Sequence, residues 1–332
     1  MKVGERDMLE FKRAFKGKTI EMTIKNKIDH WLKSLELKGD DIKDADKEQN
    51  KKFIDAIKND IVVTGGAIAS MLGGYLPNDY DVYFKTITTA TLVANYYISK
   101  LPIANNEKTS RAIVRDNAFG GIEIMIKSAG VAGEEIIQDT YDYFEMMPKN
   151  SSEDYLNQIA VKTSGKYTVA FMTSNAITLT DSIQIITRFC GEPDTIHGNY
   201  DFVHCTNYWT YDGGLVTNPD AVMSILSREL KYVGSKFPIC SLFRVRKFIE
   251  RGWTITAGEI FKISWDVSKL DLNDYSVLRE QLTGLDTAYF SEVLAILQET
   301  VFKTEKEIDR TYLFELISRT FDKPEVFMKE DE

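Results

Sequence analysis

The chain has 332 residues, enough for two modest domains or for one domain with helical additions. Its content of 43% hydrophobic and 27% charged residues is typical of a folded globular protein and argues against a disordered chain. The formal net charge of −9 excludes a protein that coats nucleic acid without specificity, because such binding needs many Lys and Arg contacts to phosphates. Any contact with a polynucleotide therefore requires a local basic patch.

The cysteines and the apolar runs indicate the compartment. Cys190, Cys205 and Cys240 form an odd, sparse set without CxxC spacing, so we expect reduced thiols and no disulfide framework. The N-terminal residues lack an apolar core of signal-peptide length, and no apolar run reaches the roughly 18 residues of a membrane span. We therefore expect a soluble, cytoplasmic protein without a membrane partner.

The first part of the chain has the pattern of helices. Charges are spread along apolar-periodic segments over residues 6–60. In segment 51–58, Phe53, Ile54 and Ile57 fall on one face, as an amphipathic helix requires. We expect residues 1–59 to form a helical N-terminal extension.

From residue 60 the pattern becomes that of a mixed core. A short apolar strand precedes Gly65 and Gly66, a helix then ends at a second glycine pair, and a turn leads into a strand that starts at Asp79. Further strands are expected at 112–115, 122–126, 167–173, 176–179 and 182–189, with a helix at 88–100. We assign residues 60–212 to this core.

After about residue 215 the pattern is mostly helical. The period of amphipathic helices is present at 221–232, at 242–251 and over much of 275–320. Residues 213–332 are therefore predicted to form a helical C-terminal domain, and the active site is expected between it and the core.

Two carboxylates on one predicted strand carry the chemistry. Asp79 and Asp81 are at i and i+2, so their side chains point to the same face, about 6.5 Å apart. Mg²⁺ takes oxygen ligands, is usually held by one or two carboxylates, and completes its shell with water and substrate phosphates. The spacing predicts a site for Mg²⁺ or Mn²⁺, and two such ions can activate an attacking hydroxyl and stabilise a leaving pyrophosphate.

The glycine pair before the helix supplies the other half of the site. Gly65 and Gly66 let the backbone approach a triphosphate closely, and the start of the following helix presents free amides to it. Thr64 and Ser70 are candidates for additional hydroxyl contacts to the nucleotide.

The segment GGAIASMLGGYLPNDYDVYF resembles the signature of the DNA polymerase β superfamily. Within that superfamily it is most similar to tRNA nucleotidyltransferases and to poly(A) polymerases of bacterial type, and chains of this look also occur among proteins of large phages. The resemblance implies an α+β fold in which a small mixed sheet is flanked by helices, with helical N- and C-terminal regions. If the chain is phage-encoded, the expected location is the host cytoplasm.

The resemblance also implies a reaction. An enzyme of this kind moves a nucleoside monophosphate from an NTP to an acceptor hydroxyl and releases pyrophosphate, with a divalent metal as cofactor. An RNA 3′ end is the first acceptor that the likeness suggests, a protein hydroxyl the second and a small molecule the third.

The third carboxylate of the superfamily pattern is missing from its expected place. It normally lies on a later strand beside the paired aspartates, and the inward position on the predicted strand 182–189 is Gln184. A neutral amide cannot act as general base for the attacking hydroxyl. Glu123 is the preferred replacement, because it alternates with apolar Ile122 and Ile124; Asp181 and Asp201 are the other candidates.

The same departure leaves a second hypothesis open. A family member without its third carboxylate can retain the fold as a catalytically degenerate nucleotide-binding or virion-associated protein.

A local basic segment is the candidate contact for the acceptor or the triphosphate. Residues 228–251 carry seven Lys and Arg residues against two Glu. Arg244, Lys247 and Arg251 fall on one helical face, and Arg244 and Lys247 are the predicted nucleotide contacts. The spacing of His197, His204 and Cys205 fits no zinc pattern, and the segment 202–205 has the pattern of a strand.

Overall fold

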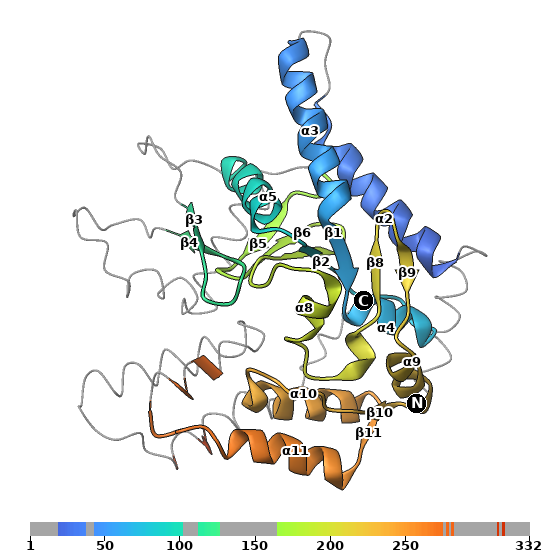
Figure 1. Ribbon diagram of the computed structural model, residues 1–332, viewed down its shortest axis with the longest axis vertical. Coiled ribbons are helices and arrows are strands. Elements are labelled where there is room, and N and C mark those ends of the chain that lie inside the picture. The colour runs from blue at the N-terminus through green and yellow to red at the C-terminus, as the bar shows by residue number, and fades with distance from the viewer. Residues whose placement is uncertain are drawn as a thin grey trace, which may run out of the picture.

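A mixed seven-stranded sheet forms the centre of the fold (Figure 1). The computed structural model describes residues 19–37, 43–101, 112–126, 165–274, 277–278, 280–281, 311 and 314–315. In spatial order the strands are β5 (Val169–Met172), β6 (Ala176–Leu179), β7 (Ile183–Ile186), β2 (Tyr80–Phe84), β1 (Ile61–Thr64), β8 (Tyr208–Thr210) and β9 (Gly214–Val216). β2 and β7 run parallel, whereas the other neighbours are antiparallel.

Helices from the first hundred residues complete one side of the core. α2 (Ile20–Leu35) starts at Thr19, whose hydroxyl accepts the N–H of Met22 at 3.2 Å, a standard N-cap. Its apolar residues recur at helical spacing, and the buried Trp31 donates its indole N–H to the hydroxyl of Tyr97 at 2.7 Å. Tyr97 belongs to α5 (Ile87–Ser99), so this hydrogen bond joins two helices in the same hydrophobic core as the sheet.

The helix α3 (Asp44–Asp60) leads directly into β1. Its first half is polar and exposed and projects from the body of the protein, while Ile54 and Ile57 are buried near its end (Figure 1). The last residue, Asp60, accepts hydrogen bonds from the N–H of Thr86 at 3.0 Å and from its hydroxyl at 2.6 Å. This carboxylate fixes the start of α5 against the end of α3.

The other face of the sheet is covered by a short helix. α8 (Pro193–His197) places Ile196 on Val62 and Tyr83, and Tyr200 packs against this cluster. Because side chains alternate along a strand, Asp81 and Tyr83 share this face, whereas Tyr80 and Val82 lie in the main core.

A separate hairpin lies beside the sheet. β3 (Ala112–Asp116) and β4 (Ile122–Ile126) pair with each other, and the N–H of Ile122 donates to the carbonyl of Thr187 at 2.8 Å. A Cβ atom at Gly121 would lie 2.3 Å from the carbonyl oxygen of Arg188, so only glycine fits this approach.

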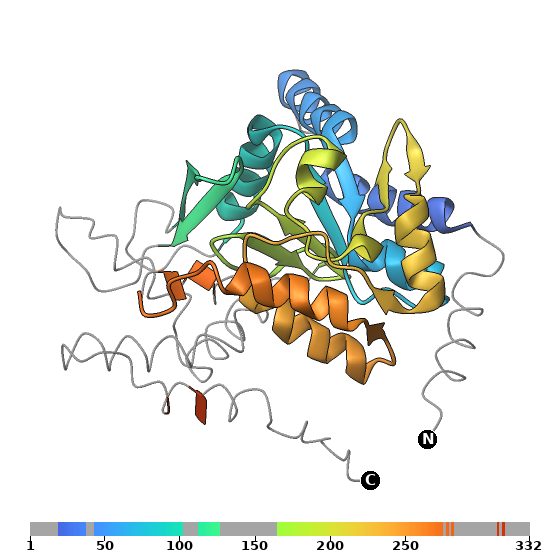
Figure 2. The ribbon, with the colours of Figure 1, turned by 60° about the horizontal axis from the view of Figure 1, so that its bottom comes forward.

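The C-terminal region described by the structure is mainly helical. It contains α9 (Pro219–Ser227), β10 (Glu229–Leu230), α10 (Pro238–Glu250), β11 (Thr254–Ile255) and α11 (Ala257–Val267). α10 and α11 lie side by side below the sheet (Figures 1 and 2). The guanidinium of Arg228 donates a hydrogen bond to the hydroxyl of Tyr75, which lies in the loop before Asp79.

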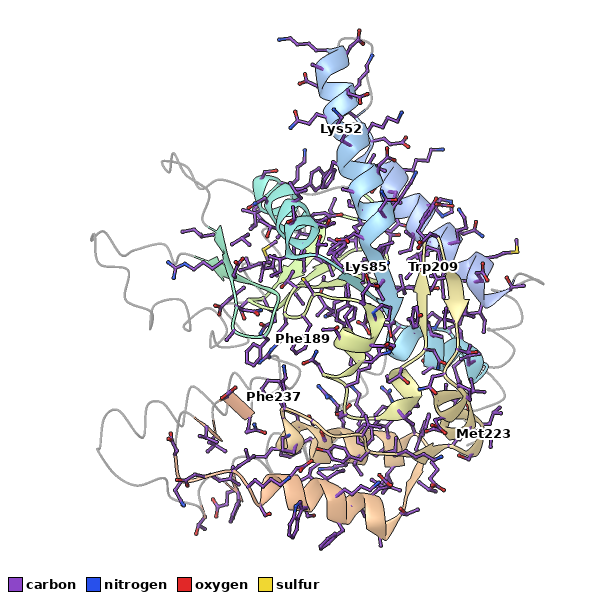
Figure 3. All side chains as sticks on the ribbon, in the orientation of Figure 1. Lys52, Lys85, Phe189, Trp209, Met223 and Phe237 are labelled. Atoms are coloured by element: carbon purple, nitrogen blue, oxygen red, sulfur yellow. The ribbon has the colours of Figure 1, made fainter. Side chains whose placement is uncertain are left out.

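An aromatic contact joins α10 to the sheet and to the hairpin. The ring centroid of Phe119, in the turn between β3 and β4, lies 6.2 Å from that of Phe189 and 6.1 Å from that of Phe237. Phe189 follows β7 and Phe237 is the N-cap of α10, and both are labelled in Figure 3. The guanidinium of Arg188 lies 4.4 Å from the ring centroid of Phe237, which adds a cation–π contact to the same cluster.

The predicted α+β fold, a mixed sheet with flanking helices, is confirmed for the part of the chain that the structure describes. Two local predictions were wrong. The helix expected at 221–232 ends at Ser227, because Arg228 adopts a left-handed φ of 51°. His204 lies in a one-turn 3₁₀ helix (Val203–Cys205), where a strand was expected.

Parts of the predicted helices at 6–60 and 275–320 lie outside the described residues. Within the described part of the chain, no helix combines the length and apolar character needed to cross a membrane.

Candidate metal and nucleotide site

Asp81 occupies the centre of the candidate site. In the sheet register it stands opposite Thr64 of β1 on one side and opposite Gln184 of β7 on the other. Burial raises the pKa of the Asp81 carboxyl to about 7, the negative charge of Asp79 adds to the rise, and the N–H of Gly66 opposes it. A cation bound beside Asp81 would therefore favour its charged form.

The glycine turn is shaped around this carboxylate. Gly65 has φ +88° and ψ −148°, a backbone conformation open essentially to glycine alone. A Cβ atom there would lie 2.8 Å from Oδ2 of Asp81 and 3.5 Å from the hydroxyl of Tyr200. The absence of a side chain at this position is what allows Asp81 to approach the turn.

Gly66 is different from its neighbour. It is exposed, it begins α4 (Gly66–Leu72), and a Cβ atom built on it would meet no atom within 4 Å. The backbone of the turn is therefore closed on the side of Asp81 and open on the side of Gly66.

Asp79 lies just before β2 and is exposed. Its charge acts on Asp81, so the structure brings the two predicted ligands together. Two nearby carboxylates repel each other, and a divalent cation between them relieves the repulsion. Among the described residues, however, no group of three or more His, Cys, Asp and Glu is arranged to hold a metal.

The position expected for the third carboxylate is filled by Gln184, as the strand pattern predicts. It lies on β7 directly across from Asp81, and its amide N–H₂ is 3.4 Å from the hydroxyl of Thr178. Glu123, the preferred replacement, lies on the separate β3–β4 hairpin, exposed and opposite Arg115. The sheet register thus places an amide beside Asp81, and the role predicted for Glu123 has no support from the topology.

Thr64 and Ser70 face different surroundings. The hydroxyl of Thr64 is buried and lies 2.8 Å from Nε2 of His197, 2.8 Å from the carbonyl of Asn207 and 3.2 Å from that of Cys205. These contacts fix the end of β1 to the segment 197–207. Ser70 is half-buried on α4. Contacts of either hydroxyl to a nucleotide stay predictions.

The basic helix α10 reaches the site face through Arg244. Its Nη1 lies 2.6 Å from Oδ2 of Asp201, so that aspartate is already paired. Burial raises the pKa of Tyr83, and the positive charge of Arg244 opposes this rise, which places the guanidinium within electrostatic range of the face that holds Asp81. Lys247 is exposed on the same helix.

Two residues near the site could not be identified from a sequence motif. Tyr200 brings its hydroxyl to Gly65 and Asp81, yet it lies in a turn far along the chain from both. Lys27 of α2 lies close enough to Asp79 for the two charges to interact. Only the tertiary fold brings these residues to the site, because neither belongs to a local motif.

The fold and the site together define an α+β protein in which a carboxylate pair is set against a glycine turn at the centre of a mixed sheet. Within this class, the chain belongs to the Gabija anti-defense 2 family, which matches residues 22–228 and hence more than half of its length. A curated relative, "Gabija anti-defense 2" of Bacillus phage SPbetaL7, is 24% identical over 125 residues. That alignment covers 37% of this chain and 31% of the relative, so the chain spans about a third of that protein.

Solved structures of CCA-adding enzymes are also similar. A Thermotoga maritima CCA-adding enzyme complexed with tRNA matches 89% of this chain and 53% of its own, with 11% identity and a TM-score of 0.37. A CCA-adding enzyme in complex with CTP matches 83% and 54%, with 14% identity and the same TM-score. Both TM-scores lie below 0.5, so neither likeness bears on the activity of this chain.

Proposed function

We propose that this chain is a metal-dependent nucleotidyltransferase, which moves a nucleoside monophosphate from an NTP to an acceptor hydroxyl. The observation that carries the proposal is the pairing of Gly65 with Asp81. A backbone held in a glycine-only conformation, with no room for a side chain, is arranged around a carboxylate whose charge is unfavourable unless a cation is bound. A purely structural turn has no need of such a carboxylate.

Each residue of the site has a role in this proposal. Asp79 and Asp81 hold Mg²⁺ or Mn²⁺, Gly65 shapes the turn beside Asp81, and the open side of the turn at Gly66 receives the β- and γ-phosphates of the NTP. The metal, when bound, polarises the phosphates and lowers the pKa of the attacking hydroxyl. Arg244 and Lys247 contribute positive charge from α10 toward the triphosphate or the acceptor.

The family name bears on the biological role. We infer that nucleotidyl transfer serves the counter-defence that the name of the family describes, with a macromolecule as acceptor. An RNA 3′ end is the first acceptor, in keeping with the likeness of the glycine and aspartate segment to tRNA nucleotidyltransferases. A hydroxyl of a protein is the second.

A catalytically degenerate nucleotide binder is the alternative, and Gln184 is the observation that favours it. An amide stands where a general base is expected, and it cannot accept the proton of the attacking hydroxyl. The two hypotheses differ in turnover and share nucleotide binding.

An incorporation assay separates them. Each labelled NTP is incubated with the protein, with Mg²⁺ or Mn²⁺, and with cellular RNA and protein as acceptors. The test variant is Asp79→Ala/Asp81→Ala, and the matched control is Asp44→Ala/Asp46→Ala, which removes two exposed carboxylates of α3. We expect label in RNA or protein with the native chain and the control, and none with the test variant.

Two other outcomes are decisive. Equal labelling by the test variant would remove Asp79 and Asp81 from the reaction. Absence of label with the native chain, although it still binds NTP, would establish the binder in place of the enzyme.

A further inference from the structure

Three segments from distant parts of the sequence converge near Asp79. They are α2, which carries Lys27; the residues before β5, which include Lys166 and Tyr167; and the turn between β6 and β7, which contains Asp181. The ammonium of Lys27 lies 5.5 Å from the ring centroid of Tyr80 and 5.6 Å from that of Tyr167. It is thus held between two aromatic rings at the start of β2.

The charges around Lys27 form one interacting group. Burial lowers the pKa of Lys27, Asp181 and Asp79 act against this, and Lys166 reinforces it. Over the residues that the structure describes, no carboxylate lies within ion-pair distance of the Lys27 ammonium. A partly dehydrated cation between two rings therefore has no close anion among these described residues.

The backbone of the two segments that face Lys27 adopts conformations of high free energy. Tyr167, Asp181 and Ser182 have φ values of 58°, 62° and 56°, a left-handed region that non-glycine residues rarely adopt. The N–H of Tyr167 donates to Oδ2 of Asp181 at 3.3 Å, and the N–H of Tyr80 donates to the carbonyl of Ser182 at 3.0 Å. Such conformations cluster where a fold positions groups for a ligand.

We propose that Lys27 and Lys166 form an anion-binding subsite beside Asp79 that takes a phosphate group of the substrate. The inference rests on the proposed function and adds α2 to the substrate-binding surface. A phosphate supplies the close anion that the Lys27 ammonium lacks, and Lys166, which is exposed, provides a second cation for it. The negative charges of Asp79 and Asp181 balance the positive charges of the two lysines. A divalent metal on Asp79 would give the whole group a net positive charge, which attracts an anion.

The phosphate has two possible sources, the triphosphate of the NTP and the backbone of a polynucleotide acceptor. Both are tested by equilibrium binding without turnover. The probes are an α,β-methylene analogue of ATP with Mg²⁺ and a short single-stranded RNA oligonucleotide. The variants are Lys27→Gln, Lys166→Gln and the conservative Lys27→Arg.

The matched control is Lys33→Gln, an exposed lysine of the same helix. We expect Lys27→Gln to weaken the binding of one probe roughly tenfold, the scale of one charge-assisted hydrogen bond, with a smaller loss in Lys166→Gln. Lys27→Arg and the control should stay near the native affinity. Lys166→Gln changes only an exposed side chain, so its loss of binding cannot be ascribed to misfolding.

The pattern of losses identifies the source. A loss confined to the ATP analogue assigns the subsite to the triphosphate. A loss confined to RNA, with the slope of log affinity against log salt reduced by about 0.7, assigns it to one backbone phosphate. Unchanged affinity for both probes in both glutamine variants would overturn the subsite while leaving the incorporation result untouched. Failure of the native chain to bind both the ATP analogue and the RNA would overturn the proposed function together with the subsite.

Discussion

A Cβ atom on Gly65 would lie 2.8 Å from Oδ2 of Asp81, and only the missing side chain allows the two residues to meet. The glycine turn and the carboxylate are therefore one structural unit, although fifteen positions separate Gly66 from Asp81 in the sequence. Hydrogen bonding from the N–H of Gly66 to Asp81 belongs to the same unit.

The two glycines should respond differently to the same substitution. Gly65→Ala introduces a clash with Asp81 at a positive φ and should destabilise the fold by about 2–4 kcal/mol, with loss of nucleotide binding. Gly66→Ala places a methyl group in open space at the start of a helix and should change stability by less than about 1 kcal/mol. Urea denaturation of both variants measures the difference, and equal effects would contradict the geometry of the turn.

Asp81→Asn should stabilise the metal-free protein. The carboxyl has a pKa of about 7 in the folded state against 3.8 in the unfolded chain, so the folded state binds more protons between these values. Stability from this group is present below pH 3.8 and is lost as the pH rises through 7. The asparagine variant avoids this loss and should be more stable at pH 8 by about 1–3 kcal/mol.

Metal binding provides the opposite test of the same residue. Mg²⁺ or Mn²⁺ should raise the Tm of the native chain and leave that of Asp81→Asn unchanged, as followed by differential scanning fluorimetry. Equal shifts in both proteins would place the metal elsewhere.

Gln184→Glu should supply the missing third carboxylate. Position 184 lies on β7 and pairs with Asp81 on the neighbouring strand β2. A carboxylate at this position would add a metal ligand and a general base. We expect tighter Mn²⁺ binding by about tenfold and faster incorporation, together with lower stability of the metal-free form, because three like charges then share the site. Thr178→Glu on the neighbouring strand is the control for a charge added nearby. A variant with unchanged metal affinity would show that position 184 does not face the metal.

His204 should make stability depend on pH below neutrality. It is buried between Phe248 and Trp253, and burial lowers its pKa to about 4 against 6.5 in the unfolded chain, with Asp201 opposing the shift. Between these values the unfolded chain binds more protons, so stability is complete above pH 6.5 and falls as the pH is lowered toward 4, by at most about 3 kcal/mol.

His204→Phe keeps the ring and should flatten this fall. His197 also has its pKa lowered to about 4 by burial and remains in the variant, so part of the slope should persist. Unfolding free energies from pH 4 to 7 measure the difference between the two proteins. Parallel curves would show that His204 is not buried in its neutral form.

The sequence predicts those parts of the site that depend on local order. The succession of strand, glycine pair, helix and aspartate strand predicts that Asp79, Asp81 and Gly65 lie together, as they do in the structure, because adjacent elements of one chain have few ways to pair. Period 2 on the later strand also identifies Gln184 as the inward residue, and the register confirms it.

Contacts between distant segments could not be predicted in the same way. Lys27 reads as an ordinary surface lysine of an amphipathic helix, and Tyr200 as a turn residue. The end of α9 was missed because Arg228 takes a conformation that usually marks glycine or asparagine. Glu123 alternates correctly on its strand, yet that strand belongs to another sheet, which periodicity alone cannot reveal.

The close fit of Gly65 to Asp81 also sets an order on evolutionary change. A lineage that keeps the aspartate meets two obstacles to a side chain at position 65, the clash with the carboxylate and the positive φ, whereas a lineage that first shortens or loses the carboxylate keeps only the cost of the positive φ. Loss of chemistry should therefore be recorded in two successive substitutions, the acid first and the glycine second. A homologue with a side chain at the glycine and an intact aspartate would have to rebuild the turn around them.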